Sequence, residues 1–178
     1  MKKAVCLFFV LIMISLLFSC DIGENTMKNH NQKISNQKLE EILDAIQAKD
    51  KNKIISSFSP EAIKKADNFE LSINALFDYF YGTVESYNDW GGPITETTKE
   101  NGEILQILDS TYDIRTTKSE YRFTIQYVVK DTANKDNIGI HSLYIIKTAE
   151  DVTSQNAYWG DGKHTPGINI GIKNADLN

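Results

Sequence analysis

The sequence of 178 residues predicts an α+β fold, in which N-terminal helices pack on one face of a curved antiparallel sheet. Two observations lead to this prediction. Between residues 35 and 80 apolar side chains recur every three to four positions, which is the period of an amphipathic helix. From residue 83 onward the period changes to two, which is the period of a half-buried strand. Helices followed by a run of strands are typical of an α+β domain.

The first half of this body contains four expected helices. Ser35 has the residue type of an N-cap, so the first helix is expected to begin there. Asp50 is placed to cap a second helix, and Ser59 followed by Pro60 marks the start of a third. Asp67 and Glu70 have the spacing of a capping box for the fourth. The apolar stripe of that fourth helix consists of Phe69, Ile73, Leu76, Phe77 and Phe80, and Gly82 is expected to end it.

The second half contains the expected strands. Asn101-Gly102 predicts a hairpin turn, because both residues tolerate a positive φ. The clearest alternation runs from Tyr121 to Lys130, where aromatic and β-branched residues alternate with polar ones. A long polar connection is expected between the last two strands. The expected strands are 83–90, 103–115, 121–130, 138–148 and 168–172.

The N-terminus has the features of a secretory signal. Two lysines precede an apolar run, 4–18, that is shorter than the about 20 residues needed to span a bilayer. The run ends at Leu17-Phe18-Ser19-Cys20, which resembles a bacterial lipobox, although Phe18 is bulkier than usual. The resemblance implies cleavage of a signal peptide, 1–19, and lipidation of Cys20. We therefore expect a lipid anchor at the extracytoplasmic face of the cell membrane, with a flexible tether, 20–34, before a single domain, 35–178.

Charge and cysteine content exclude several classes of protein. Without Lys2 and Lys3 the chain has 17 basic and 24 acidic residues, a net charge of −7. Nucleic-acid binders normally carry a basic excess, so no nucleic-acid partner is expected. The two cysteines, Cys6 and Cys20, both lie in or next to the signal, which excludes thiolate metal sites and cysteine nucleophiles from the body. No cofactor and no metal site are expected.

Five segments resemble a family of small Gram-positive lipoproteins of uncharacterised function. The resemblance covers nearly all of residues 35–173, and the motif around Trp159 is the most distinctive. It implies a lipid anchor and a cone-like domain of the nuclear-transport-factor-two and cystatin-like superfold, and it carries no catalytic residues. The segments are FSPEA at 58–62, LFDYFYG at 76–82, SLYIIK at 142–147, AYWGDG at 157–162 and TPGINI at 165–170.

Five residues are candidates for binding a ligand or partner. His141 lies on a strand, where it is either a general base in a pocket or a histidine at the core edge that bonds to a neighbouring backbone. Trp159, Asp161 and His164 form either a recognition patch or a loop folded on itself, with the indole filling the cone. Trp90 either lines a pocket mouth or belongs to the core at a hairpin end.

Three functions are open at this point. The first is a non-enzymatic binding module for a small ligand or an extracytoplasmic protein. The second is an immunity protein that neutralises a secreted toxin, since an acidic body suits electrostatic attraction to a basic partner. The third is an isomerase or hydrolase built on His141 and a nearby carboxylate, which requires an open cavity around that imidazole.

Overall fold

The structure is a computed structural model that describes residues 19–150 and 164–171, with side chains described from residue 26 onward. It divides into two units, residues 1–34 and 35–178. The core, the sheet and the candidate site described below all belong to the second unit. Within the described residues, no helix combines the length and the apolar character required to cross a membrane.

The helices occur in the expected order, but the first and the fourth have boundaries that differ from the prediction, and α5 ends at Tyr79, before the predicted stop at Gly82. The first helix runs from Ser19 rather than from Ser35, so the predicted start was wrong and the segment expected to be a flexible tether is helical. This segment has no proline, but it contains a glycine and three asparagines, which favour helices poorly, and it has no apolar stripe for a periodicity argument to detect. The helices are α2 (Ser19–Ala48), α3 (Lys51–Ser57), α4 (Pro60–Lys65) and α5 (Phe69–Tyr79).

Two of the four predicted caps are present; Ser35 lies inside α2, and the cap at Asp67 is absent. The Asp50 carboxylate accepts a hydrogen bond of 3.0 Å from the Lys53 backbone N–H, and the Ser59 hydroxyl accepts one of 3.1 Å from the Ala62 backbone N–H. The capping box predicted at Asp67 is wrong. Instead Asn68 precedes α5 in the left-handed conformation, with φ of 53° and no side-chain cap bond.

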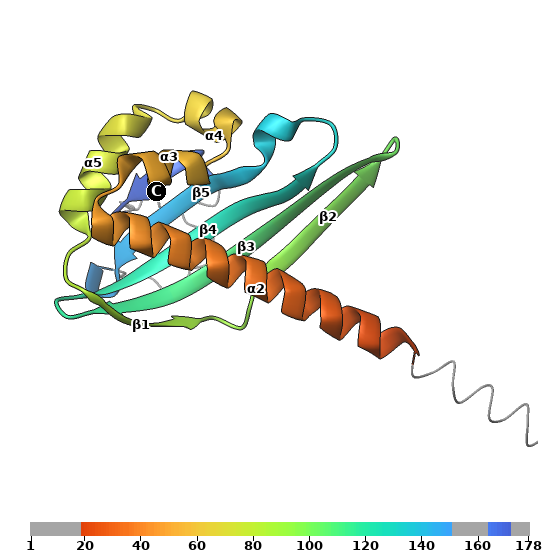
Figure 1. Cartoon of the computed structure of the whole chain (residues 1–178), viewed down its shortest axis with the longest axis horizontal. Helices are drawn as coiled ribbons and strands as arrows, with labels where there is room; N and C mark the ends of the chain where they lie inside the picture. The colour runs from red at the N-terminus through yellow and green to blue at the C-terminus, as the bar shows by residue number, and fades with distance from the viewer. Residues whose placement is uncertain (1–18, 151–163, 172–178) are drawn as a thin grey trace, which may run out of the picture. The chain divides into compact units, whose positions relative to one another are not determined.

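The strands form one curved, open sheet of six strands (Figure 1). Its order is β1-β3-β4-β5-β6, and β2 pairs with the same long strand β3 as β1 does. The pair of β5 and β6 is parallel, so the prediction of a wholly antiparallel sheet was wrong at this edge. The long connection between these two strands is long enough to return the chain for parallel pairing. The strands are β1 (Val84–Asp89), β2 (Ile94–Glu100), β3 (Glu103–Thr116), β4 (Glu120–Asp131), β5 (Gly139–Lys147) and β6 (Gly167–Ile170).

Bulges interrupt the alternation that the sequence predicts. On β4 the alternation places Tyr121, Phe123 and Ile125 in the core, but the register with β5 shifts between Gln126 and Tyr127. The extra residue there is His141 on β5, so β4 keeps its alternation and Tyr127 still packs against the core. The alternation fails one step later, because Val128 and Lys130 pair with the consecutive residues Ile107 and Gln106 of β3, which leaves Val129 as an extra residue on β4. Val128 is buried there, whereas the sequence pattern predicted Val129.

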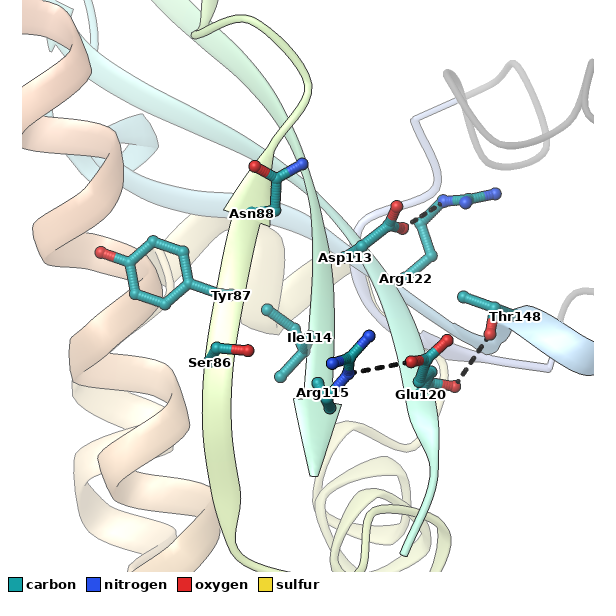
Figure 2. Close-up of a pocket in the computed structure, with 9 residues that line it drawn as sticks. All are labelled: Ser86, Tyr87, Asn88, Asp113, Ile114, Arg115, Glu120, Arg122 and Thr148. Atoms are coloured by element: carbon teal, nitrogen blue, oxygen red, sulfur yellow. Dashed lines mark hydrogen bonds and ion pairs between the residues drawn. The ribbon is translucent and has the colours of Figure 1, made fainter. Parts of the chain in front are cut away.

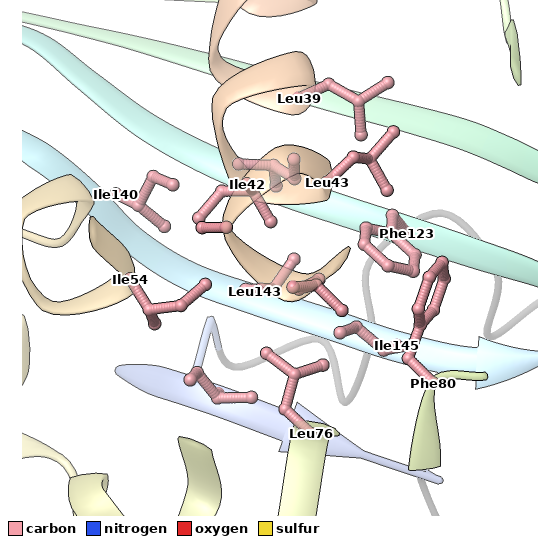
Figure 3. Close-up of a cluster of buried hydrophobic side chains, with 14 of the residues drawn as sticks. Leu39, Ile42, Leu43, Ile54, Leu76, Phe80, Phe123, Ile140, Leu143 and Ile145 are labelled. Carbon is pink, nitrogen blue, oxygen red and sulfur yellow. The ribbon is translucent and has the colours of Figure 1, made fainter. Parts of the chain in front are cut away.

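The core lies between the helices and one face of the sheet. Figure 3 shows side chains of α2, α3 and the end of α5 converging on β4 and β5. Phe80 lies 4.6 Å from Tyr121 and 5.6 Å from Phe123 between ring centroids, which links the end of α5 to β4. Because this face is apolar, the polar residues of the same strands must lie on the opposite face. The buried core includes Leu39, Ile42, Leu43, Ile54, Leu76, Ile140, Leu143 and Ile145.

Candidate binding site

The sheet face turned away from the helices carries a ladder of polar residues on β3 and β4. Tyr112 and Ile114 point into the core, so their neighbours along β3 point to the other side. We call this surface the polar face. Its members form four directly opposed cross-strand pairs, which are Asp109 with Gln126, Thr111 with Thr124, Asp113 with Arg122, and Arg115 with Glu120.

One end of the polar face is buried. Asp109 is only 6% exposed, and the Gln126 side-chain amide donates a hydrogen bond of 3.1 Å to its Oδ1. The same amide nitrogen lies 2.9 Å from His164 Nδ1, and that ring nitrogen lies 3.9 Å from Asp109 Oδ1. Burial raises the pKa of the Asp109 carboxyl, while the bond from Gln126 and the proximity of His164 oppose the rise.

His141 lies next to this group. Its side chain forms a hydrogen bond with the backbone of His164, and burial lowers the pKa of its imidazole. The carboxylate of Asp109 approaches His164 rather than His141. The two histidines singled out in the sequence are therefore neighbours, and the hydrogen bond matches the interpretation of His141 as a residue bonded to a neighbouring backbone.

Trp90 lies toward the other end of the polar face. Its indole Nε1 donates a hydrogen bond of 2.9 Å to Asp113 Oδ2, and Arg122 Nε donates one of 2.8 Å to Asp113 Oδ1. The Arg122 guanidinium carbon lies 4.2 Å from the centroid of the indole ring. Both oxygens of Asp113 are thus engaged, and the aromatic ring covers one side of the guanidinium.

A hollow of about 410 Å³ opens beside these residues, at the edge of the sheet formed by β1. We call it the β1 hollow. Figure 2 shows that β1 contributes Ser86 and Asn88, while β3 and β4 contribute the charged side chains. In the register, Ser86 opposes Arg115 and Asn88 opposes Asp113, so all four lie on the same face of the sheet. The lining residues are Ser86, Tyr87, Asn88, Asp113, Ile114, Arg115, Glu120, Arg122 and Thr148.

The ion pair at the mouth of the β1 hollow is exposed. Arg115 Nε donates to Glu120 Oε1 at 3.0 Å, and the side chains are 64% and 54% exposed. Exposed pairs of this kind contribute only about 0–1 kcal/mol to stability. A ligand that interacts with Arg115 or Glu120 would therefore displace little existing interaction energy.

Comparison with known families identifies the domain. Residues 41–148 match DUF5104, which is described as a domain of unknown function. The chain belongs to this family. The matched range runs from within α2 past the end of β5, so it includes the whole β1 hollow. The comparison with curated proteins finds no match.

The DUF5104 domain brings some of the predicted site residues together. Trp90 and His164 contact Asp113 and Gln126 of the polar face, and His141 forms a hydrogen bond with the backbone of His164. Trp159 and Asp161 lie outside the described residues. The side chain of Cys20 also lies outside the described part. Across the described residues no three histidine, cysteine or acidic side chains gather in a way that could hold a metal ion.

Sequence reasoning missed most residues of the β1 hollow. The available signal was the row of polar residues at every second position of β3 and β4, on the side opposite the apolar residues. Such a row normally indicates a solvated face. In this DUF5104 domain the pairing of β1 with β3 places Ser86 and Asn88 beside this row of polar residues, and together they line the β1 hollow. The pairing cannot be predicted from the sequence of either strand alone.

Proposed function

We propose that this DUF5104 protein is a lipid-anchored, extracytoplasmic binding protein without catalytic activity, and that its ligand occupies the β1 hollow. The observation that carries the proposal is the convergence of β1, β3 and β4 on one hollow lined by two arginines and two carboxylates. Concave sites with a few convergent polar groups are the usual places for ligand binding.

The proposal of a lipid anchor rests on the N-terminal sequence. Lys2 and Lys3, the apolar run and the small residue before Cys20 together form the pattern of a lipoprotein signal. Two or more acyl chains hold a protein stably at a membrane, and one chain does so only marginally.

A labelling experiment tests the anchor. Cells expressing the full chain are fed an alkyne analogue of palmitate, and incorporation is compared between the wild type, Cys20→Ala and Cys6→Ala. We expect label in the wild type and in Cys6→Ala, and none in Cys20→Ala. Surface protease should digest the labelled protein in intact cells or spheroplasts. Equal labelling of Cys20→Ala would refute the anchor.

The fold supports a finer proposal about architecture. We propose that the curved sheet around the helices is a cone of the nuclear-transport-factor-two and cystatin-like superfold. The order of helices before a long-stranded, curved sheet supports this (Figure 1). In such an arrangement the hollow at β1 lies outside the apolar core that the helices fill.

A thermal-shift screen tests binding. The protein is purified from membranes in detergent, and its melting temperature is recorded against a diverse library of small polar molecules. A ligand at one hundred times its Kd stabilises the folded state by about 2.7 kcal/mol, which is easily measured. Stabilisation should be lost in Arg115→Gln and kept in Lys118→Gln, which makes the same charge change at an exposed neighbouring position. Equal stabilisation of both variants would place the ligand elsewhere.

The charge of the body favours a second candidate, an immunity protein against a basic secreted toxin. After removal of the signal the net charge is −7, and every residue of the edge strand β2 is exposed. Electrostatic attraction would then make association fall steeply with salt. Expression of the full chain should protect cells from such a toxin, and a failure to protect would remove this candidate.

A further inference from the structure

We infer that the β1 hollow takes a small zwitterion of the α-amino carboxylate type, with its carboxylate on Arg115, Ser86 and Asn88 and its ammonium group on Glu120. This inference rests on the proposed function, because it specifies the ligand of the same hollow. It follows from the donors and acceptors that line the hollow and from how they are already engaged.

The donor side of the hollow has unused hydrogen-bonding capacity. Arg115 uses only its Nε for Glu120, and within the described chain its terminal Nη groups form no hydrogen bond. The Ser86 hydroxyl and the Asn88 amide, both exposed, also form none there. An arginine fork matches the two oxygens of a carboxylate, and hydroxyl and amide donors complete the set that an oxyanion requires.

The backbone brings these three donors together. Ser86 lies directly opposite Arg115 in the antiparallel pair, where Cβ atoms are about 4.5–5.5 Å apart. Asn88, two residues further along β1, is the diagonal neighbour of Arg115 on the same face, within about 7–8 Å. The register shift between Val84 and Ser86 sets this alignment, because without it Ser86 would oppose a different residue of β3.

The acceptor side has one available carboxylate. Both oxygens of Asp113 already accept hydrogen bonds, from Trp90 and Arg122. Glu120 uses only Oε1 for Arg115 within the described chain, which leaves Oε2 for a cationic group of a ligand. An ammonium placed beside Arg115 would be repelled, so its favourable position is on the Glu120 side.

The mixture of charges selects against simpler ligands. A plain anion that contacts Arg115 also meets Glu120 and Asp113, and a plain cation that contacts Glu120 also meets Arg115 and Arg122. A ligand that carries both charges satisfies both sides. The hollow, at about 410 Å³, lies in the lower part of the range of about 300–1,000 Å³ that is usual for small-molecule sites.

Ligand-observed saturation-transfer NMR tests this inference on the detergent-solubilised full-length lipoprotein. The probes are a mixture of the L-amino acids and two matched probes. N-acetyl-L-alanine lacks the ammonium group, and L-alanine amide lacks the carboxylate. A fourth probe set, glucose and N-acetylglucosamine, carries no charge. We expect saturation transfer to at least one zwitterion and little or none to the other three probes.

Variants then locate the zwitterion. Arg115→Gln and Glu120→Gln should each weaken its binding by about tenfold or more, since hydrogen bonds to charged groups contribute about 1.5–3 kcal/mol. Lys118→Gln should leave its affinity unchanged. Ser86→Ala should weaken it less than Arg115→Gln, because it removes a neutral donor. Melting curves of the free proteins establish that all four variants are folded.

Two results would overturn the inference, and they differ in what they say of the proposed function. If the uncharged sugars bind and Ser86→Ala abolishes their binding while no zwitterion binds, the hollow is a binding site of another class and the proposed function stands. If a zwitterion binds but Arg115→Gln and Glu120→Gln leave its affinity unchanged, the ligand lies outside the β1 hollow and both proposals fail.

Discussion

Trp90 and Arg122 stack on the polar face, with the guanidinium carbon 4.2 Å from the centroid of the indole ring. Both side chains donate to the same carboxylate, Asp113. Trp90 follows directly after β1, whereas Arg122 is on β4, two strands away in the sheet. The three residues therefore hold the chain after β1 against the strands that line the β1 hollow.

We expect Trp90→Phe to lower the free energy of unfolding by about 1–2 kcal/mol, because it removes the hydrogen bond to charged Asp113 and keeps an aromatic face for Arg122. Trp90→Ala also removes the stacking and the apolar contact, so a larger loss of about 2–4 kcal/mol is expected. Urea denaturation of the purified protein measures both values. Equal losses in the two variants would show that the ring contributes nothing beyond its hydrogen bond.

Sequence reasoning recovered the helices and strands where a single period dominates. The stripe from Phe69 to Phe80 and the alternation from Tyr121 to Ile125 both place the predicted residues in the core. The start of α2 was missed because a polar helix without an apolar stripe has no period to detect. The parallel pairing of β6 was missed because alternation is the same for either strand direction.

The candidate site was only partly accessible to sequence reasoning. Trp90 and His164 attracted attention because indole and imidazole side chains are chemically distinctive. Arg115 and Glu120 did not, since charged residues at alternate strand positions are what any solvated sheet face shows. Their significance depends on Ser86 lying opposite Arg115, and that relationship exists only once the register of β1 is known.

Gly139 occupies a position where a side chain does not fit. Its φ is +133°, and a Cβ there would lie 2.6 Å from the backbone nitrogen of Ser59. That nitrogen donates a hydrogen bond of 2.9 Å to the Ile140 carbonyl, which joins the start of α4 to β5. We expect Gly139→Ala to lower the free energy of unfolding by about 2–4 kcal/mol, through strain and loss of this contact.

Gly102 provides the matched control for Gly139. It also has a positive φ, of +84°, but nothing lies within 4 Å of a Cβ added there. Gly102→Ala should therefore cost only the conformational strain, about 1–2 kcal/mol. Urea denaturation of both variants gives the comparison. A loss for Gly139→Ala no larger than that for Gly102→Ala would contradict the close contact with Ser59.

His141 should make the domain less stable in mild acid. Burial lowers the pKa of its imidazole below the usual 6.5, and the charges of Lys65 and His164 act in the same direction, while the hydrogen bond with the His164 backbone opposes them. Because the folded-state pKa is depressed, the neutral form favours folding. This contribution is fully present above about pH 6.5 and is lost as the pH falls through the folded-state pKa.

NMR titration of the His141 ring protons measures this shift directly. We expect the midpoint in the folded protein to lie below the midpoint of the same residue in concentrated urea. The His141→Asn variant should lose less stability than the wild type between pH 7.5 and pH 5. Identical midpoints in the folded and unfolded protein would show that the burial of His141 has no electrostatic consequence.

Tyr87 should make the domain sensitive to alkaline pH. Burial, followed by its hydrogen bond of 2.8 Å to Glu40 Oε1 on α2 and the charges of Glu40 and Asp89, raises the pKa of the Tyr87 phenol to about 12. The folded state therefore favours the protonated phenol. This contribution is complete below about pH 10 and disappears as the pH rises toward 12.

Phenolate absorbance at 295 nm follows the ionisation of Tyr87. We expect Tyr87→Phe to lack one phenolate that forms late in the wild-type titration, and to lose stability less steeply between pH 10 and pH 12. Glu40→Gln should move the same phenolate to lower pH, because the repulsion between two negative charges is removed while an acceptor for the hydroxyl remains. A titration unchanged by Glu40→Gln would mean that the contact between β1 and α2 does not hold Tyr87 in its protonated form.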